Sequence, residues 1–140
     1  MIVGLGTDVV DIDRFRFDEL KRERFAKRVF TETEMAYAMR HRNVAQSLAG
    51  AFAAKEATRK AFGRAIPWRM IGVRHEHDGT PCIELRGGAQ ALISTRGVRT
   101  MHLTIAHSRN SALATVVLET EDFGGGLVAV RSDQSEVAAR

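Results

Sequence analysis

The pattern of hydrophobic and polar residues changes twice along the chain, and it predicts strands on both sides of a helical region. Hydrophobic residues alternate with other types over residues 2–12, which is the period of a strand. The region that follows is free of proline up to residue 66, and its alanine-rich part suits a long helix. Strand-like segments separated by turn residues return beyond Pro67. We predict helices at 14–30, 31–42, 44–62 and 88–97, and strands at 2–12, 71–77, 81–87, 101–108 and 112–119.

Two local signals support these boundaries and lead to a fold class. Thr31 is followed three residues later by Glu34, a spacing that caps the start of a helix. Asp78-Gly79 stands between two predicted strands and tolerates the positive φ of a tight turn. We expect an α/β protein of the α+β kind, with a helical N-terminal half whose long central helix packs on an antiparallel β layer.

The end of the chain differs in composition from the rest. Residues 1–120 suit a single domain, whereas residues 121–140 begin with a glycine run and end in polar residues. We interpret 121–140 as a Gly-rich linker and C-terminal tail, within which 127–130 could add a short strand.

Composition narrows the class of protein. The chain has 140 residues, of which 44% are hydrophobic and 27% charged, which is typical of a globular domain. No run of about twenty apolar residues exists, so we expect no membrane partner. The single cysteine, Cys82, rules out an internal disulfide and suits a reducing cytoplasm. A net charge of +4 suggests an acidic partner: nucleic acid, an acidic protein or a polyphosphate.

Two carboxylates occupy positions where apolar residues are expected. Glu56 falls on the stripe of its helix that carries Leu48 and Phe52, and Asp8 shares a strand face with Gly4 and Gly6. The two glycines leave room for something bulky to approach the strand. A buried carboxylate is costly unless it gains a cation or hydrogen bonds.

Two interpretations of these acids follow from the residues alone. Asp8 and Glu56 together suit a hard divalent cation held by oxygen, with Lys60 reaching a phosphate beside it and Gly63 letting a pyrophosphate approach the backbone. Alternatively, Asp8 caps a turn and Glu56 pairs with Lys60 at the i, i+4 spacing. The two interpretations have about equal weight.

Three segments of the chain resemble a known family. "GLGTDVVDIDRF", "LAGAFAAKEATRKAFG" and "MHLTIAHSRNSALATVV" are similar to segments of the holo-[acyl-carrier-protein] synthases, the short-chain, homotrimeric class of 4'-phosphopantetheinyl transferases. The resemblance runs from Met1 to about Glu119 in the family's order. It favours the metal-binding interpretation and implies the 4'-phosphopantetheinyl transferase fold.

The resemblance also implies a reaction and roles for individual residues. It implies Mg²⁺-dependent transfer of 4'-phosphopantetheine from coenzyme A to a serine of apo acyl carrier protein, with release of adenosine 3',5'-bisphosphate, in fatty acid biosynthesis. Asp8 and Glu56 would bind Mg²⁺, and with Lys60 they would form the catalytic set. Lys60 and Gly63 would also bind coenzyme A. The serine proton would go to Glu56 or to a metal-bound water.

Further residues gain roles from the same resemblance. His102 and Thr104 share a strand face that the family places near the coenzyme. Acyl carrier proteins are acidic, so the implied partner is a protein and not nucleic acid. The positions that match the family's carrier-protein contacts are basic: Arg14, Lys21, Arg24 and, more weakly, Arg28. The resemblance implies a homotrimer packed through its sheets, with active sites at subunit junctions.

Three other histidines receive structural interpretations. His107 shares its strand face with Leu103 and Ile105, so we expect a satisfied core histidine. His75 and His77 share another strand face but have no third ligand at suitable spacing, so we expect them to be exposed.

The chain departs from the family at one position of the long helix and in the loop after it. Ala51 stands where the family usually has an arginine near a coenzyme phosphate, and the loop "GRAIPWR" replaces a shorter one. Arg64 or Arg69 could supply the missing charge from another direction. The competing functions are a transferase for a specialised polyketide-type carrier, and a non-catalytic basic module on the same fold.

Overall fold

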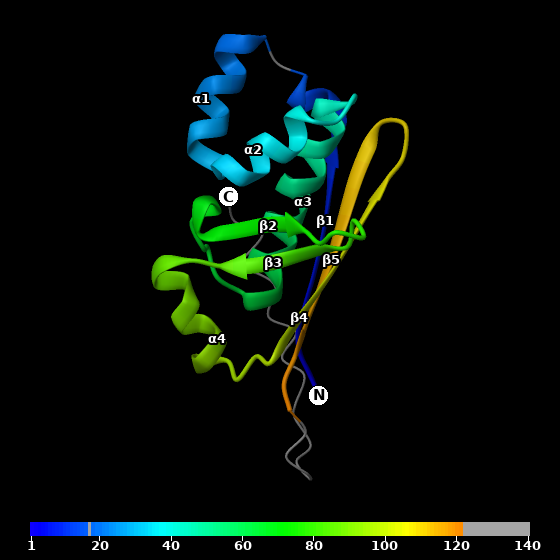
Figure 1. Ribbon diagram of the computed structural model, residues 1–140. Helices are drawn as coiled ribbons and strands as arrows, with labels where there is room; N and C mark the ends of the chain where they lie inside the picture. The colour runs from blue at the N-terminus through cyan, green and yellow to red at the C-terminus, as the bar shows by residue number, and fades with distance from the viewer. Residues whose placement is uncertain (17, 122–140) are drawn as a thin grey trace.

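The computed structural model describes residues 1–16 and 18–121 and has the expected mixture of helices and antiparallel strands (Figure 1). Its strands are β1 (Ile2–Asp11), β2 (Ile71–His75), β3 (Pro81–Leu85), β4 (Thr100–His107) and β5 (Ser111–Glu119). Its α-helices are α1 (Glu19–Val29), α2 (Glu32–Met39), α3 (Val44–Phe62) and α4 (Ala91–Thr95). Short 3₁₀ turns are η1 (Ile12–Phe15), η2 (Trp68–Met70) and η3 (Gly87–Gln90).

β1, β5 and β4 form one antiparallel sheet in that order. Thr115 of β5 is opposite Thr7 of β1 and Thr104 of β4, so the first strand of the chain pairs with the last one described. α3 packs against one face of this sheet, and it also contacts β2 of the separate β2–β3 hairpin. Figure 1 shows α3 lying behind the hairpin and beside β1.

The close packing of β1 on α3 explains the glycines of β1. A Cβ atom on Gly6 would lie 1.9 Å from the carbonyl oxygen of Ala57, and one on Gly4 would lie 2.4 Å from that of Ala61. The bulky group that approaches this strand is therefore the protein's own helix. Asp8 follows on the same strand face, so its side chain is directed to the helix side.

α3 is buried on nearly every side, because it contacts β1, β5, β4, β2, α2 and η1. Its alanines let these elements approach closely, and Ala49, Ala53, Ala54 and Ala57 have no solvent exposure. Over residues 48–58 the helix has no exposed side on which a charged residue can rest. Lys55 and Glu56 are therefore buried together with the alanines.

The predicted helix at 14–30 is wrong at its start. Residues 12–15 form the 3₁₀ turn η1, and α1 begins only at Glu19, with the Asp18 side chain accepting a hydrogen bond from the backbone N–H of Lys21. The turn places Phe15 in a cluster of rings, with its centroid 5.5 Å from that of Phe52. Burying Phe15 among these rings and capping α1 with Asp18 together stabilise the chain more than extending α1 back to residue 14 would.

The other local signals are confirmed with small changes. Thr31 and Glu34 make the reciprocal hydrogen bonds of a capping box at the start of α2. The hairpin turns at Gly79, whose φ is +87°, but its strands are shorter than predicted because residues 76–80 form the loop. The predicted helix at 88–97 is divided into η3 and α4.

Within residues 1–16 and 18–121, no helix has both the length and the apolar character to cross a membrane. The tail prediction from residue 122 onward, including a strand at 127–130, lies outside the described residues.

Candidate functional site

Glu56 is buried in α3, and its carboxylate is held by two donors. Only 3% of the residue is exposed. Its Oε1 accepts a hydrogen bond from Trp68 Nε1 at 2.7 Å and pairs with Arg59 Nη1 at 3.0 Å. The Arg59 guanidinium also lies over the Trp68 ring, 5.2 Å from its centroid. These contacts offset the cost of burying the charge.

Asp8 and Lys60 form a second ion pair that links β1 to α3. Lys60 Nζ lies 2.8 Å from Asp8 Oδ1 and also donates to the backbone oxygen of Thr7 at 3.0 Å. The expected alternative, in which Glu56 pairs with Lys60 and Asp8 caps a turn, is wrong. The side chain of Lys60 reaches across to Asp8 on β1 instead of to Glu56 at i−4, because β1 packs very closely on this part of α3.

The two ion pairs lie along the same edge of the contact between α3 and β1. Ala57 and Ala61 face the glycines of β1. Glu56 and Lys60 each precede one of these alanines, so both emerge about 100° from it on the same side. Asp8 lies on the strand face that packs on this helix. The structure thus places Lys60 in contact with Asp8, and Glu56 one helical turn before Lys60 on α3, whereas a metal site shared by Asp8 and Glu56 stays a prediction.

The chemistry of Asp8 and Glu56 fits a hard divalent cation. Mg²⁺ is commonly held by one or two carboxylates, with water and substrate phosphate completing its coordination. The side chain of Asp8 is 16% exposed and that of Lys60 is 38% exposed, so solvent reaches this pair. Among residues 1–16 and 18–121 no three His, Cys, Asp or Glu side chains cluster as metal ligands.

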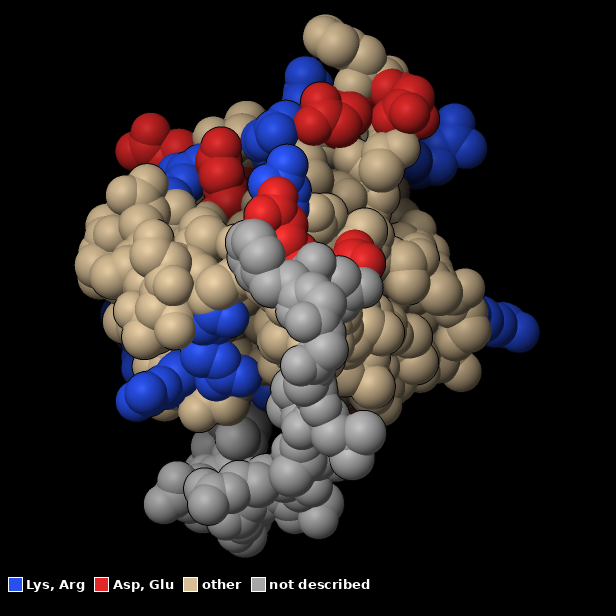
Figure 2. Space-filling model, turned by 90° about the horizontal axis from the view of Figure 1, so that it is seen from below, with Lys and Arg blue, Asp and Glu red and all other residues tan. Residues whose placement is uncertain are grey.

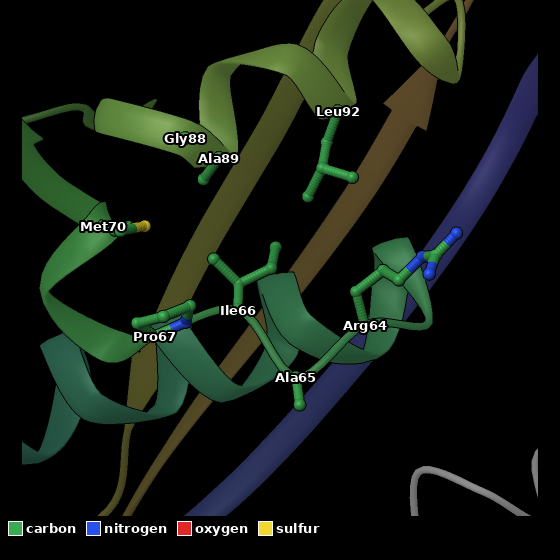
Figure 3. A pocket seen from close by; sticks show the side chains of 8 residues that line it. All are labelled: Arg64, Ala65, Ile66, Pro67, Met70, Gly88, Ala89 and Leu92. Carbon is green, nitrogen blue, oxygen red and sulfur yellow. The ribbon is translucent and has the colours of Figure 1, made fainter.

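Gly63 ends α3 in the left-handed conformation, with φ +62°, and its N–H donates to the carbonyl oxygen of Lys60. The loop that follows borders a shallow cavity of about 290 Å³. Figure 3 shows Ile66, Met70 and Leu92 directed toward this cavity, whereas the guanidinium of Arg64 extends away from them. The lining also includes Ala65, Pro67, Gly88 and Ala89.

Ala51 lies at a different cavity, of about 240 Å³, between α2, α3, the hairpin and β4. Three histidines line it, together with Tyr37: His41, His75 and His107. Neither Arg64 nor Arg69 lines this cavity, and Arg69 donates to the backbone oxygen of Lys27 instead. Within one chain, neither arginine therefore replaces the charge expected at position 51.

His102 and Thr104 lie on the opposite face of the sheet from Asp8. Thr104 is level with Thr7 and Thr115, whereas Asp8 is paired with Ala114 on the α3 side. His102 Nε2 lies 2.7 Å from Glu119 Oε2 on the exposed face. One chain does not bring these two residues to the ion pairs of α3.

The interpretation of His107 as a core residue is wrong. Its side chain is exposed at the end of β4, although its ring lies against Gly50 of α3. Partial burial lowers the pKa of His107. β4 ends at His107. The strand face that is partly buried at Ile105 is therefore exposed to solvent at residue 107.

His75 and His77 differ in their surroundings. His77 is exposed, as expected, but it lies in the loop after β2. His75 is half-buried and stacks on Tyr37 with the ring centroids 3.8 Å apart. Its expected exposure is therefore wrong, and burial, with a smaller effect of His41, lowers the pKa of His75. The stacking partner comes from α2, which strand periodicity cannot reveal.

The predicted carrier-protein contacts are exposed. Lys21, Arg24 and Arg28 lie on α1, and Arg14 lies in η1 with its guanidinium 5.9 Å from the centroid of the Phe52 ring. Figure 2 views the molecule from below in the orientation of Figure 1, at the end away from α1. In that view acidic and basic side chains lie together along the upper edge, a separate basic group lies at the lower left, and most of the remaining surface is uncharged.

Sequence reasoning missed the donors that hold Glu56. Arg59 stands at i+3 from Glu56, which is a known pairing distance on a helix, so this partner was within reach of the sequence. Trp68 is the single tryptophan of the chain, at the start of η2 in the connection that follows α3. Its hydrogen bond to Glu56 depends on how that loop folds back over α3.

Comparisons with known proteins agree with this fold. Residues 4–116 match the 4'-phosphopantetheinyl transferase superfamily. Over 130 residues the chain is 44% identical to the holo-[acyl-carrier-protein] synthase of Paramagnetospirillum magneticum, covering 86% of this chain and 98% of that one. It is 35% identical over 127 residues to that of Clostridium novyi, covering 89% and 92%.

Solved structures of the same kind superpose on this one. The holo-[acyl-carrier-protein] synthase of Neisseria meningitidis has a TM-score of 0.77 at 31% identity, covering 86% of this chain and 100% of that one. That of Bacillus anthracis, solved in complex with coenzyme A (3',5'-ADP), has a TM-score of 0.69 at 32% identity, covering 86% and 99%.

Proposed function

The chain belongs to the holo-[acyl-carrier-protein] synthase family of the 4'-phosphopantetheinyl transferase superfamily, and on this premise we propose that it transfers 4'-phosphopantetheine from coenzyme A to a serine of apo acyl carrier protein. The observation that carries the proposal is the contact between β1 and α3, where Lys60 pairs with Asp8 and the buried Glu56 lies one helical turn earlier on α3. Such a concentration of charge on an otherwise apolar helix suits a polyphosphate substrate.

The proposed reaction is a phosphoryl transfer. The serine Oγ of the carrier forms a bond to the phosphorus that bears the pantetheine arm. The bond from that phosphorus to the bridging oxygen breaks, and adenosine 3',5'-bisphosphate leaves with the electron pair. The serine proton passes to Glu56 or to water. Catalysis of this kind depends on positioning and on neutralising charge, and the chain needs no nucleophile of its own.

Asp8 and Glu56 are the residues that would hold Mg²⁺ in this proposal. The ion would neutralise pyrophosphate charge and orient the phosphates. Lys60 pairs with Asp8 in the structure, and its 38% exposed side chain is free to turn to a phosphate when substrate arrives. Gly63, at the end of the same helix, leaves the backbone open to the pyrophosphate.

The nucleotide end of coenzyme A is proposed to bind at the cavity beside Ala51. Its lining offers histidine and tyrosine side chains and contains no Asp or Glu, which suits an anionic group. Ala51 precedes Glu56 by five residues, so the two lie about 140° apart around α3. Ala51 and Glu56 therefore lie on different sides of the same helix. We propose that one coenzyme contacts the Ala51 side of α3 in one subunit and the Glu56 side of α3 in another.

A homotrimer would bring these surfaces together. The sheet face opposite α3 exposes Leu5 by 64%, Val9 by 62% and Leu113 by 40%. Large apolar side chains gathered on one sheet face favour an interface with another protein. We propose that three copies pack through this face, with His102 and Thr104 acting near a neighbouring subunit's coenzyme.

The proposed macromolecular partner is acidic. Arg14, Lys21, Arg24 and Arg28 are exposed on η1 and α1 and suit the negative surface expected of an acyl carrier protein. We place the reaction in fatty acid biosynthesis, in a reducing cytoplasm that suits the single cysteine.

Mass spectrometry tests the proposal directly. Apo acyl carrier protein is incubated with this protein, coenzyme A and Mg²⁺, with a chelator control and an Asp8→Asn control. A mass gain of one phosphopantetheine, lost in both controls, is expected. A gain with a polyketide-type carrier alone would assign the specialised function instead. If no carrier gains mass while coenzyme A still binds, the protein is a non-catalytic module.

A further inference from the structure

The indole N–H of Trp68 is directed at the carboxylate of Glu56. We infer that Trp68 is a positioning residue, which fixes the orientation of Glu56 for binding a divalent cation. The inference rests on the proposed function, in which Glu56 is a metal ligand, and it assigns a task to the loop in which this chain departs from its family. Trp68 itself touches neither metal nor substrate in this role.

Two groups converge on one oxygen of Glu56, but they differ in charge. Trp68 Nε1 and Arg59 Nη1 lie 2.7 and 3.0 Å from Oε1. A guanidinium repels a divalent cation that binds the same carboxylate, whereas a neutral indole N–H does not. Trp68 can therefore orient Glu56 without opposing the metal. Arg59 contributes indirectly as well, since it stacks on the indole ring.

The position of Trp68 is itself fixed by a buried cation. Lys55 Nζ donates to the backbone oxygen of Trp68 at 2.9 Å and forms an ion pair with Glu34 at 2.8 Å. Both side chains of this pair are excluded from solvent. The Phe52 ring also packs beside the indole, with the centroids 6.0 Å apart. Three parts of Trp68 are thus held by different contacts. Lys55 holds its backbone oxygen, Arg59 and Phe52 pack on its ring, and Glu56 accepts from its N–H.

A fixed orientation matters because a carboxylate that can rotate presents its lone pairs to a metal for only part of the time. Hydrogen-bond partners of metal ligands contribute roughly 10–100-fold to metal affinity in other proteins. Trp68→Phe keeps an aromatic ring beside Arg59, and it removes the N–H donor together with the pyrrole part of the indole, whose packing loss the control below measures. Since Arg59 remains on Oε1, an effect near the lower end of that range is expected.

The test measures metal binding apart from turnover. Mn²⁺ is titrated by electron paramagnetic resonance against the full chain with coenzyme A and without carrier protein, for wild type, Trp68→Phe and Phe15→Leu. Phe15 is a matched control, because it packs in the same ring cluster through Phe52 and donates nothing to Glu56. Thermal unfolding of each variant is recorded in parallel.

We expect the Kd for Mn²⁺ to rise about tenfold in Trp68→Phe. In Phe15→Leu it should stay within about twofold, even though the Tm falls. Equal Mn²⁺ affinities of Trp68→Phe and wild type would overturn the inference. So would a Kd that rises equally in both variants, because loss of packing would then explain it. Failure of the proposed metal site is a separate result: wild type would not bind Mn²⁺, or Asp8→Asn would bind it equally well.

Discussion

Lys55 of α3 and Glu34 of α2 form an ion pair that solvent does not reach, with Nζ and Oε1 2.8 Å apart. Glu34 Oε1 also accepts from the backbone N–H of Val73, and Oε2 completes the capping box with Thr31. Lys55 in turn donates to the backbone oxygens of Trp68 and Ile71. One buried pair therefore joins two helices, η2 and the hairpin, and it supports the loop that reaches Glu56.

The first prediction concerns this pair. Lys55→Met leaves the Glu34 carboxylate buried without its cation, and removal of one partner of such a pair costs about 3–5 kcal/mol. Urea denaturation should show that loss in the free energy of unfolding. The double variant Lys55→Met with Glu34→Gln should recover part of it, because no uncompensated charge remains. A single variant as stable as wild type would contradict the role of the pair.

Asp8→Asn separates catalysis from folding. The Asp8–Lys60 pair is partly solvated, so its loss should cost no more than about 1 kcal/mol of stability. If Asp8 binds metal, phosphopantetheine transfer should fall by about 100-fold or more, as for loss of one charge-stabilising group. Initial rates and a thermal melt are measured together. A variant with a markedly lower Tm that keeps its specific activity below that Tm would identify Asp8 as a structural residue.

Gly6→Ala tests the close approach of β1 to α3. The added methyl group would lie 1.9 Å from the Ala57 carbonyl oxygen, so strand and helix must separate. Overpacking of this kind costs about 1–3 kcal/mol or more, and here it should also disturb the Asp8–Lys60 contact. Gly88→Ala is the control, because no atom lies within 4 Å of its Cβ position. Equal Tm values for the two variants would argue against the tight contact.

The pH dependence of stability should report the half-buried ring of His75. Its pKa is lowered by burial and by His41, so the unfolded chain takes up a proton at higher pH than the folded one. The stabilising contribution is complete above the unfolded pKa, about 6.5, and is lost as the pH falls below it. His75→Phe keeps the stacking on Tyr37, so it should lose less stability than wild type between pH 7.5 and 5.5 in urea titrations. Parallel losses would exclude this ring as the cause.

The open sheet face predicts how assembly can be broken. Leu5→Lys places a charge at a side chain that is 64% exposed in one chain, so the isolated fold should tolerate it. In a trimer packed through this face, the same charge would be desolvated at the interface. Light scattering should show a trimer for wild type and smaller species for the variant. Identical masses would show that the sheet face is not the interface.

Much of the secondary structure was within reach of the sequence, because strand and helix periods are local. Gly4, Gly6 and Asp8 on one face of β1, and the capping box of Thr31 and Glu34, depend on residues only two or three positions apart. The grouping of Asp8 with Glu56 was one of two interpretations that the residues allowed, and the resemblance to a family favoured it. The break before α1 was missed because its cause is burial of Phe15 against rings from other elements.

The sequence by itself determined which side chains are costly to bury, and the tertiary structure decided which partner each one receives. Lys60 could reach Glu56 along the helix, yet it pairs with Asp8 because the glycines of β1 bring that strand against α3. Glu56 receives Trp68 from a loop twelve residues away, and Lys55 receives Glu34 from another helix. Helical spacing only limits which partners within the same helix a charged side chain can reach. The energies that select among them come from desolvation and packing of segments distant in sequence.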